Sequence, residues 1–192
     1  MHTTIIFAHP WHGSFNKAIL DQTVSVLLEH GKAYEIIDLN KDGFEPVMLE
    51  KDLALYAQGR STDPLVLKYQ KILKTTDELI IIFPIWWYNV PAILKGFMDK
   101  VMLKDFAYVE TKSGLKGQLT HIKKTSIFTT SETPTLYMNL FKGNPIHGVF
   151  IPGTLKGVGL HNVKWCNCGF ITRSTRTKKE KYLRRIAKIV AG

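Results

Sequence analysis

Residues Thr76–Val101 read TDELIIIFPIWWYNVPAILKGFMDKV and contain the clearest structural pattern in the chain. The stretch contains five apolar residues, Leu79–Phe83, with no polar alternation, which is typical of a parallel strand covered on both faces. Pro84 ends the run because proline cannot donate to a strand ladder. Pro91 then opens a helix, and from Leu94 onward apolar residues recur at the spacing of one helical face. A buried strand, a loop at its carboxyl end and an amphipathic helix predict the ligand-binding edge of an open α/β sheet.

The loop between this strand and this helix is rich in aromatic residues, since Ile85, Trp86, Trp87, Tyr88 and Asn89 follow one another. Three consecutive aromatic side chains cannot all point inward from a loop. We therefore expect them to line a binding site rather than to belong only to the core. Trp87 and Tyr88 would supply an apolar wall for a flat ring, and the peptide groups of the loop would supply N–H donors to its heteroatoms.

Length and composition place the chain among ordinary globular proteins. It has 192 residues, of which 45% are hydrophobic and 22% charged, enough for one domain with a sizeable core. We expect a single domain over residues 1–192 in the cytoplasm, because no basic leader precedes the first apolar run and no apolar stretch reaches about 18 residues. Cys166 and Cys168 are too few for a disulfide framework and lack a second ligand pair for zinc, so we predict no metal site.

The formal net charge of +10 is the unusual feature of the composition. Such a charge favours anionic ligands, including nucleic acids and membrane surfaces. Much of it lies in Arg173–Lys188, where Thr177 and Glu180 have the spacing of a capping box for a last helix, Thr177–Val190. Tyr182 is the only aromatic residue there and falls on the predicted buried face. We therefore expect the lysines and arginines to face solvent, and we predict no nucleic-acid binding.

The remaining pattern predicts strands that alternate with helices. The expected strands are Ile5–Ala8, Tyr34–Leu39, Leu79–Phe83, Thr125–Thr130 and Asn162–Cys168. The expected helices run from Ile19 to near Gly31, from the Asp63-Pro64 cap, from Pro91, and over Thr177–Val190. The other segments are Asn40–Asp52, expected to be irregular, Met102–Lys124, expected to be a loop with a hairpin, and Ser131–Gly159, expected to be short helices broken by Pro145 and Pro152. This alternation predicts an α/β fold, a doubly wound parallel sheet of five strands with helices on both faces, and the flavodoxin-like order 2-1-3-4-5 suits this length.

The loop after the first strand, His9–Asn16, has the composition of a phosphate site. The helix that follows offers unpaired N–H groups and the positive end of its dipole. His9, Ser14 and Asn16 can add side-chain donors, and Gly13 lets the backbone approach closely. Alternatively, Ser14 only caps the helix, and spacing alone does not decide between the two. The chain has no Walker lysine motif and no G-x-G-x-x-G after a strand, so triphosphate and dinucleotide fingerprints are absent.

The end of the fourth strand carries Thr129, Thr130, Ser131 and Glu132 in succession. Their hydroxyl groups and exposed amides can hydrogen-bond the edge of a heterocycle. Tyr137 follows five residues after Glu132, and its phenol is a candidate catalytic group that would stabilise a developing anion. A packed tyrosine is the alternative on spacing alone.

These motifs resemble a known family. Phe7–Asn16 has the pattern F-A-H-P…S-F-N, and Phe83–Val101 reads F-P-I-W-W-Y-N-V-P-A-I-L-K-G-F-M-D-K-V; both are similar to the flavodoxin-like NAD(P)H:quinone oxidoreductases. Phe106–Tyr108 and Cys168–Phe170 fall in the same order as in that family, and the resemblance extends to about residue 172. It looks closest to the short bacterial branch, which includes general stress protein 14-type proteins and ancillary subunits of glutathione-gated potassium efflux systems.

The resemblance implies a non-covalent flavin that takes hydride from NAD(P)H and then passes both electrons to a quinone or another small aromatic acceptor. The implied flavin-binding residues are His9, Ser14, Phe15 and Asn16 at the phosphate end, Pro84, Ile85, Trp86, Trp87, Tyr88 and Asn89 along the ring, and Thr129, Thr130, Ser131 and Glu132 at its pyrimidine edge. Tyr137 would stabilise negative charge on the reduced flavin. Homodimers with the site at the subunit boundary are common in the family, and we carry this over as an expectation.

Three departures from the family pattern refine the prediction. Relatives usually follow the threonine pair with two glycines, whereas this chain has Ser131 and Glu132, and a carboxylate there would change acceptor preference. Animal members pair the tyrosine with a histidine a few residues on, whereas Met138–Asn144 contains none, so a tyrosine–histidine relay is not assumed. The chain also lacks the long C-terminal extension of the larger animal members, which favours FMN over FAD.

We therefore predict a flavin-dependent NAD(P)H oxidoreductase that reduces quinones or similar acceptors. One alternative is a flavin-binding regulatory subunit of a membrane potassium-efflux transporter, and nothing in the sequence excludes it. Another is a one-electron carrier of the flavodoxin type. Such carriers tend to be acidic, whereas this chain is basic.

Overall fold

Five parallel strands form the central sheet of the computed structural model, which describes residues 1–192. They are β1 (His2–Phe7), β2 (Ala33–Asp38), β3 (Glu78–Pro84), β6 (Lys124–Thr130) and β7 (Val163–Cys168). Their spatial order is β2-β1-β3-β6-β7, which is the predicted order 2-1-3-4-5. The predicted flavodoxin-like fold is therefore confirmed. The expected hairpin in the long connection is also present, as β4 (Tyr108–Thr111) and β5 (Gly114–Gly117) pair antiparallel.

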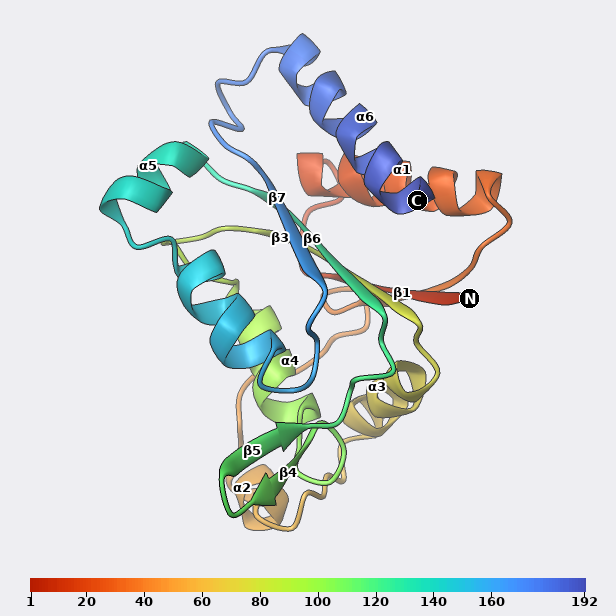
Figure 1. Cartoon of the computed structure of the whole chain (residues 1–192), viewed down its shortest axis with the longest axis vertical. Coiled ribbons are helices and arrows are strands. Elements are labelled where there is room, and N and C mark those ends of the chain that lie inside the picture. The colour runs from red at the N-terminus through yellow and green to blue at the C-terminus, as the bar shows by residue number, and fades with distance from the viewer.

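Helices cover both faces of the sheet. They are α1 (Phe15–Glu29), α2 (Glu50–Tyr56), α3 (Pro64–Lys74), α4 (Ala92–Val101), α5 (Thr135–Phe141), the π-helix η1 (Ile146–Leu155) and α6 (Arg176–Ala191). One face carries α1 and α6, whereas α3, α4 and η1 lie on the other (Figure 1). None of these helices combines the length and the apolar character needed to cross a lipid bilayer.

Burial of β3 on both faces holds these layers together. Every residue of β3 is buried, and successive side chains of a strand point to opposite faces. Ile80 and Ile82 accordingly belong to the apolar core beneath α1 and α6. Ile81 and Phe83 belong to the larger core beneath α3, α4 and η1. The continuous apolar run thus reflects two cores that meet at one strand, as its lack of alternation predicts.

The strand register brings the predicted site segments to one edge of the sheet. Ile6 of β1 pairs with Ile81 of β3, and Pro84 at the end of β3 pairs with Thr130 at the end of β6. Parallel strands share the direction of their carboxyl ends, so the loops after β1, β3 and β6 meet there. The chain turns outward in opposite directions from β1 and β3, which is the switch point where open α/β sheets bind ligands.

Several sequence-based boundaries need correction. Helix α2 occupies part of the segment expected to be irregular, because the Asp52 carboxylate accepts the Leu49 N–H at 3.0 Å and closes the first turn. The cap of α6 is Thr175, whose hydroxyl accepts the Lys178 N–H at 3.3 Å, and not Thr177. The predicted capping-box acid, Glu180, instead pairs with an arginine one turn before it.

Proline also behaves differently from the expectation at two places. Pro152 lies inside η1 rather than breaking it. Pro152 has no N–H and so removes one helical hydrogen bond. The helix continues beyond Pro152 through i→i+5 hydrogen bonds, such as the one from Lys156 N–H to the Ile151 oxygen at 2.9 Å. Pro91 is the residue before α4 and not its first helical residue.

A buried ion cluster ties α4 to the segments around α2 and α3. The Lys100 side chain is 3% exposed, and its Nζ lies 3.5 Å from Asp52 and 3.2 Å from Asp63. It also donates to the Glu45 carbonyl oxygen at 3.0 Å and lies over the Phe44 ring. One cation thus balances two carboxylates that also cap helices, since Asp63 caps α3.

Replacing Lys100 with alanine should lower the free energy of unfolding by about 3–5 kcal/mol, because two carboxylates would be left without their cation in a buried place. Denaturant unfolding followed by circular dichroism measures this. Lys95→Ala is the control, because Lys95 pairs with Asp99 on the exposed side of the same helix. A loss no larger for Lys100→Ala than for Lys95→Ala would contradict a structural role for the cluster.

Candidate functional site

A cleft of about 270 Å³ opens at the carboxyl edge of the sheet. One wall is the aromatic loop after β3, and the other is the segment after β6 with the start of α5. The lining residues are Ile85, Trp86, Trp87, Tyr88, Ser131, Glu132, Thr133 and Met138. The structure therefore brings together the two segments that the sequence singled out, and adds Thr133 and Met138 to them.

The aromatic loop is a tight reverse turn with an unfavourable backbone. Trp87 and Tyr88 have φ values of 49° and 63°, in the left-handed region that non-glycine residues rarely adopt. Two hydrogen bonds close the turn, from Trp86 N–H to Asn89 oxygen at 3.1 Å and from Asn89 N–H to Trp86 oxygen at 2.9 Å. Each left-handed residue costs roughly 1–2 kcal/mol. Strain of this kind persists where a site requires it.

The turn places its three aromatic side chains in different environments. Trp87 is 97% exposed, Trp86 is about half exposed, and Tyr88 is half buried with the Lys142 ammonium 5.6 Å from its ring centre. The expectation that the three cannot all point inward is confirmed. An indole in full contact with water contributes nothing to the core, so the fold alone does not explain Trp87. The start of the turn is fixed to the sheet, because β3 ends at Pro84 and the Ile85 N–H donates to the Thr130 carbonyl oxygen at 2.7 Å.

His9 connects the loop after β1 to this turn. Its ring lies edge-on to the Trp86 ring, with the centroids 6.0 Å apart. His9 Nδ1 accepts the Trp11 N–H at 3.0 Å, so the Nε2 atom of the neutral ring carries the proton and can donate. Burial lowers the pKa of His9 below its ordinary value, which favours this neutral form.

Ser14 caps α1, because its Oγ accepts the Lys17 N–H at 3.2 Å. The cap uses Ser14 Oγ as an acceptor, so its hydroxyl proton stays available to a ligand, and a role at a phosphate stays a prediction. At Gly13 a Cβ would lie 2.5 Å from the exposed Trp11 indole, so a larger residue would force that indole to move. Phe15, the first residue of the helix, is half buried and stands 6.2 Å from the Tyr182 ring. It belongs to the packing between α1 and α6.

Asn16 joins the loop after β1 to the end of β6. Its amide Nδ2 donates to the Thr130 hydroxyl at 2.9 Å, and the residue is buried. Its Oδ1 is buried and has no hydrogen-bond partner in the chain. A buried acceptor without a partner is costly, so a ligand hydroxyl or amide at this position would stabilise it.

The Thr129 hydroxyl is engaged within the chain, because the strand turns that side chain to the opposite face from Thr130, and a role for Thr129 at a ligand stays a prediction. Thr129 Oγ1 donates to Asn167 Oδ1 at 2.9 Å and accepts the Trp165 indole N–H at 2.9 Å. Ser131 is similarly committed, as its hydroxyl donates to Thr133 oxygen at 2.6 Å and accepts the Asn167 amide at 2.8 Å. Only the Thr130 side chain of the threonine pair remains beside the first loop.

Glu132 and Tyr137 lie at the outer side of the cleft. The Glu132 carboxylate accepts the Thr172 hydroxyl at 2.5 Å and lines the cleft. Tyr137 is 43% exposed, packs against Phe141 with ring centroids 5.1 Å apart, and does not line the cleft. Met138 takes that place, because adjacent helical residues point about 100° apart. A spacing argument could not tell which of the two faces inward.

The titratable groups elsewhere form no metal site. No group of three histidine, cysteine or acidic side chains comes together in a way that would hold an ion. His147, the first histidine after Tyr137, lies on η1 in a hollow beside Trp165 and Asn144, and it does not line the aromatic cleft.

Together these groups fit a flat ring with a hydroxylated, anionic tail. The ring would lie against Trp86 and Tyr88, the tail hydroxyl groups would meet the orphan acceptor of Asn16, and the anion would meet the first turn of α1 beside His9. The fit rests on the chemistry of these donors and acceptors.

Comparison with known proteins identifies the family of the chain. A family model described as flavodoxin-like fold, Flavodoxin_2, matches residues 1–189. An uncharacterized NAD(P)H oxidoreductase of Haemophilus influenzae is 27% identical over 86% of this chain and 82% of its own length. NAD(P)H dehydrogenase [quinone] 1 of Cavia porcellus is 31% identical over 75% of this chain. The match covers 57% of that protein, so this chain spans little more than half its length.

Solved structures also match the chain over nearly its whole length. Smu.1420 from Streptococcus mutans superposes with a TM-score of 0.87 at 33% identity, covering 100% of this chain and 99% of that one. The NAD(P)H:quinone oxidoreductase of Methanothermobacter marburgensis gives 0.86 at 26% identity, covering 100% and 98%. An FMN-dependent NADH-azoreductase of Bacillus anthracis, solved in complex with FMN, gives 0.79 at 17% identity, covering 99% and 97%, and shares the fold.

Proposed function

The chain belongs to the Flavodoxin_2 family, and from this premise we propose that it is a flavoprotein oxidoreductase that uses NAD(P)H to reduce quinones or similar small aromatic acceptors. The observation that carries the proposal is the strained aromatic turn at the switch point of the sheet, set beside the first turn of α1. The activities for which the Haemophilus, Cavia and Methanothermobacter relatives are named support it.

We propose FMN as the resident cofactor, with FAD as the alternative. His9, Ser14 and Asn16 would hold the phosphate and its polyol chain, and Trp86 and Tyr88 would hold the ring. The Bacillus anthracis neighbour, which has a chain of similar length, carries FMN, which supports the smaller cofactor. When bound, FMN supplies the hydride chemistry by accepting two electrons and returning them.

The protein's own residues would bind, orient and exclude water. The main-chain N–H groups of Trp87 and Tyr88, which make no hydrogen bond within the chain, would donate to ring heteroatoms, and the Trp87 side chain would close over the outer face. Glu132 lies at the cleft mouth, held by Thr172. Its negative charge would disfavour anionic acceptors there and favour neutral quinones.

The first test is the visible absorption spectrum of the purified protein, with the released cofactor identified by mass. Bound FMN is the expected result, and protein that stays colourless after reconstitution would overturn the proposal.

Trp87→Gly should raise the dissociation constant for FMN at least ten-fold. Its stability should stay the same or rise by about 1 kcal/mol, because glycine removes the left-handed strain. Leu115→Ala, an exposed change on the distant hairpin, is the control and should retain FMN.

Tyr137→Phe should slow reduction of the bound FMN by NAD(P)H by roughly ten-fold or more while leaving FMN bound, if the phenol donates a hydrogen bond to developing negative charge. Stopped-flow absorbance at the flavin band measures this rate. Met138→Leu keeps the volume of the cleft wall and should have little effect. Equal rates in Tyr137→Phe and the parent protein would remove Tyr137 from the mechanism.

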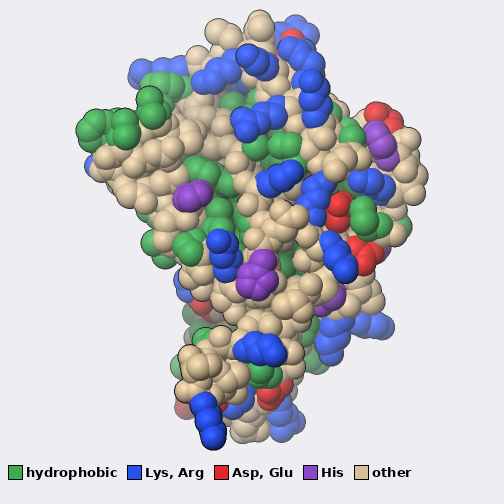
Figure 2. Space-filling model, viewed as in Figure 1, with side chains coloured by type: hydrophobic (Ala, Val, Ile, Leu, Met, Phe, Trp, Pro, Cys, Tyr) green, Lys and Arg blue, Asp and Glu red, His purple; other side chains and the backbone are tan.

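A second copy of the chain is the expected partner at this edge. The large apolar side chains that are more than 40% exposed there include Trp86, Trp87, Leu136, Tyr137, Leu140 and Phe141. Hydrophobic side chains gather over α5 on the surface (Figure 2). A patch of this kind marks an interface, and it would bring Tyr137 under cover beside the cleft. Sedimentation should give twice the 21.9 kDa mass of one chain. A monomer at micromolar concentration would contradict the homodimer.

The regulatory-subunit alternative stays a prediction. Stable co-purification with the cytoplasmic part of a potassium-efflux transporter would favour it over the free-standing enzyme.

A further inference from the structure

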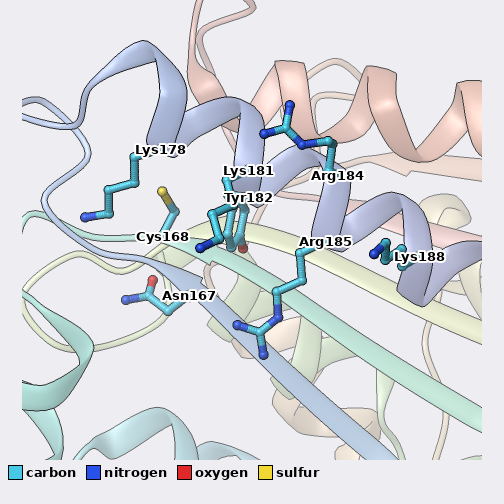
Figure 3. Close-up of a pocket in the computed structure, with 8 residues that line it drawn as sticks. All are labelled: Asn167, Cys168, Lys178, Lys181, Tyr182, Arg184, Arg185 and Lys188. Atoms are coloured by element: carbon cyan, nitrogen blue, oxygen red, sulfur yellow. The ribbon is translucent and has the colours of Figure 1, made fainter.

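A second cavity lies between α6 and β7. This groove has a volume of about 600 Å³ and shares no lining residue with the aromatic cleft. Lys178, Lys181 and Arg185 extend from α6 toward β7, where Asn167 and Cys168 form the other wall, whereas Arg184 is turned away (Figure 3). The proposed redox function uses none of these residues.

The groove holds cations that the chain does not neutralise. Helix α6 carries seven lysines and arginines and one acid, Glu180, which pairs with Arg176 outside the groove. Lys178 donates to the Gly169 carbonyl oxygen at 2.9 Å. Lys181, Arg185 and Lys188 are exposed and make no hydrogen bond or ion pair, although they line the groove together. Like charges three and four residues apart repel along a helix, so an anion placed here would stabilise it.

Lys164 adds a further free cation from the strand side. It is exposed on β7 and has no ionic partner, since the nearby Lys124 takes Glu78. Lys164 and Arg185 both lie close enough to Cys166 to lower the pKa of its thiol, although burial raises that pKa overall. The strand and the helix therefore present positive charge to the same channel.

The outer edge of β7 is open. It is the last strand of the sheet and pairs only with β6. The Cys168 carbonyl accepts the Ser131 N–H at 3.1 Å, so Cys168 directs its main-chain groups to the β6 side. Main-chain groups alternate along a strand, so Trp165 and Asn167 direct theirs to the open side. An edge of this kind is a template for another extended chain.

We propose that this groove binds an extended acidic segment of a partner protein, which pairs with the open edge of β7 and places its carboxylates against Lys164, Lys181 and Arg185. Alternate carboxylates of an extended chain are about 6.7 Å apart. Lys181 and Arg185 are one helical turn apart, about 6 Å along α6. The two spacings match, and the strand supplies main-chain pairing while the helix supplies charge specificity.

The geometry disfavours other anions. The cations from Lys178 to Lys188 are spread over about 15 Å of helix, which is too far for one phosphate group. A nucleic-acid strand needs aromatic faces for its bases. Tyr182 is buried in this groove, and Phe170, the nearby exposed aromatic residue, does not line the groove and has the Lys178 ammonium 5.8 Å from its ring centre.

The test uses the purified full-length protein and a fluorescein-labelled eight-residue peptide, capped at both ends, in which glutamate alternates with threonine or valine. Fluorescence anisotropy at low salt should show saturable binding that weakens as salt is added. Lys181→Glu combined with Arg185→Glu should raise the dissociation constant at least ten-fold. Lys51→Glu combined with Lys112→Glu changes the net charge equally at exposed sites outside the groove and should leave binding unchanged.

Two peptide controls separate strand pairing from charge alone. One copy is N-methylated at every glutamate and the other at every threonine and valine, so each blocks one of the two possible hydrogen-bonding edges. At least one copy should bind ten-fold more weakly than the parent peptide. Undiminished binding of both copies, or an equal loss in the two double variants, would overturn the proposal. Equal or tighter binding of single-stranded DNA with the same number of charges would also overturn it, since the groove would then be a general polyanion site.

Discussion

Strand β3 is buried on both faces, and this burial determines how the layers of the protein are arranged. A strand with Ile80 and Ile82 on one side and Ile81 and Phe83 on the other is stable only if a helical layer covers each side. Parallel strands need crossover connections, and the crossover helices provide these two covering layers. Parallel strands in turn send every site loop to the same edge. The position of the cleft therefore results from an apolar run of five residues, and its chemistry comes from the aromatic turn after Pro84.

The same constraint explains where strain accumulates. β3 ends at a proline, and α4 begins just after another, so only a few residues are left to reverse the chain. Glycine would make this turn at no steric cost, yet Trp87 and Tyr88 occupy its left-handed positions. The sheet and α4 hold both ends of the turn rigidly, which lets the aromatic residues stay in an unfavourable conformation. A rigid scaffold beneath a strained, exposed turn is the arrangement expected for preorganised ligand contacts.

Sequence reasoning succeeded where periodicity or proline dictated the outcome and failed where partners distant in sequence decided it. The five strands followed from local sequence patterns, and their order followed from the alternation of strands with helices and from the chain length. The hydroxyl of Thr129 faces Trp165 and Asn167, which lie 36 and 38 residues later, so no local pattern could reveal its direction. Thr177 has the spacing of a capping box with Glu180. In the structure Glu180 pairs with Arg176, and Thr175 caps the helix instead. Met138 lines the cleft in place of Tyr137, because packing decides which face of α5 points inward.

The carboxyl ends of the strands and the outer edge strand, β7, differ in chemistry. The cleft at the carboxyl edge is mainly apolar and aromatic, whereas the β7 edge is lined with cations. Charge on an edge strand commonly prevents unwanted pairing, and Lys164 alone would serve that purpose. Protection of the edge strand does not require Lys181, Arg185 and Lys188, which lie about one helical turn apart on α6, make no ion pair and line the same groove. Repulsion among these three cations destabilises the isolated chain and supports no other part of its structure. Selection of a partner by charge therefore explains these residues better than protection does.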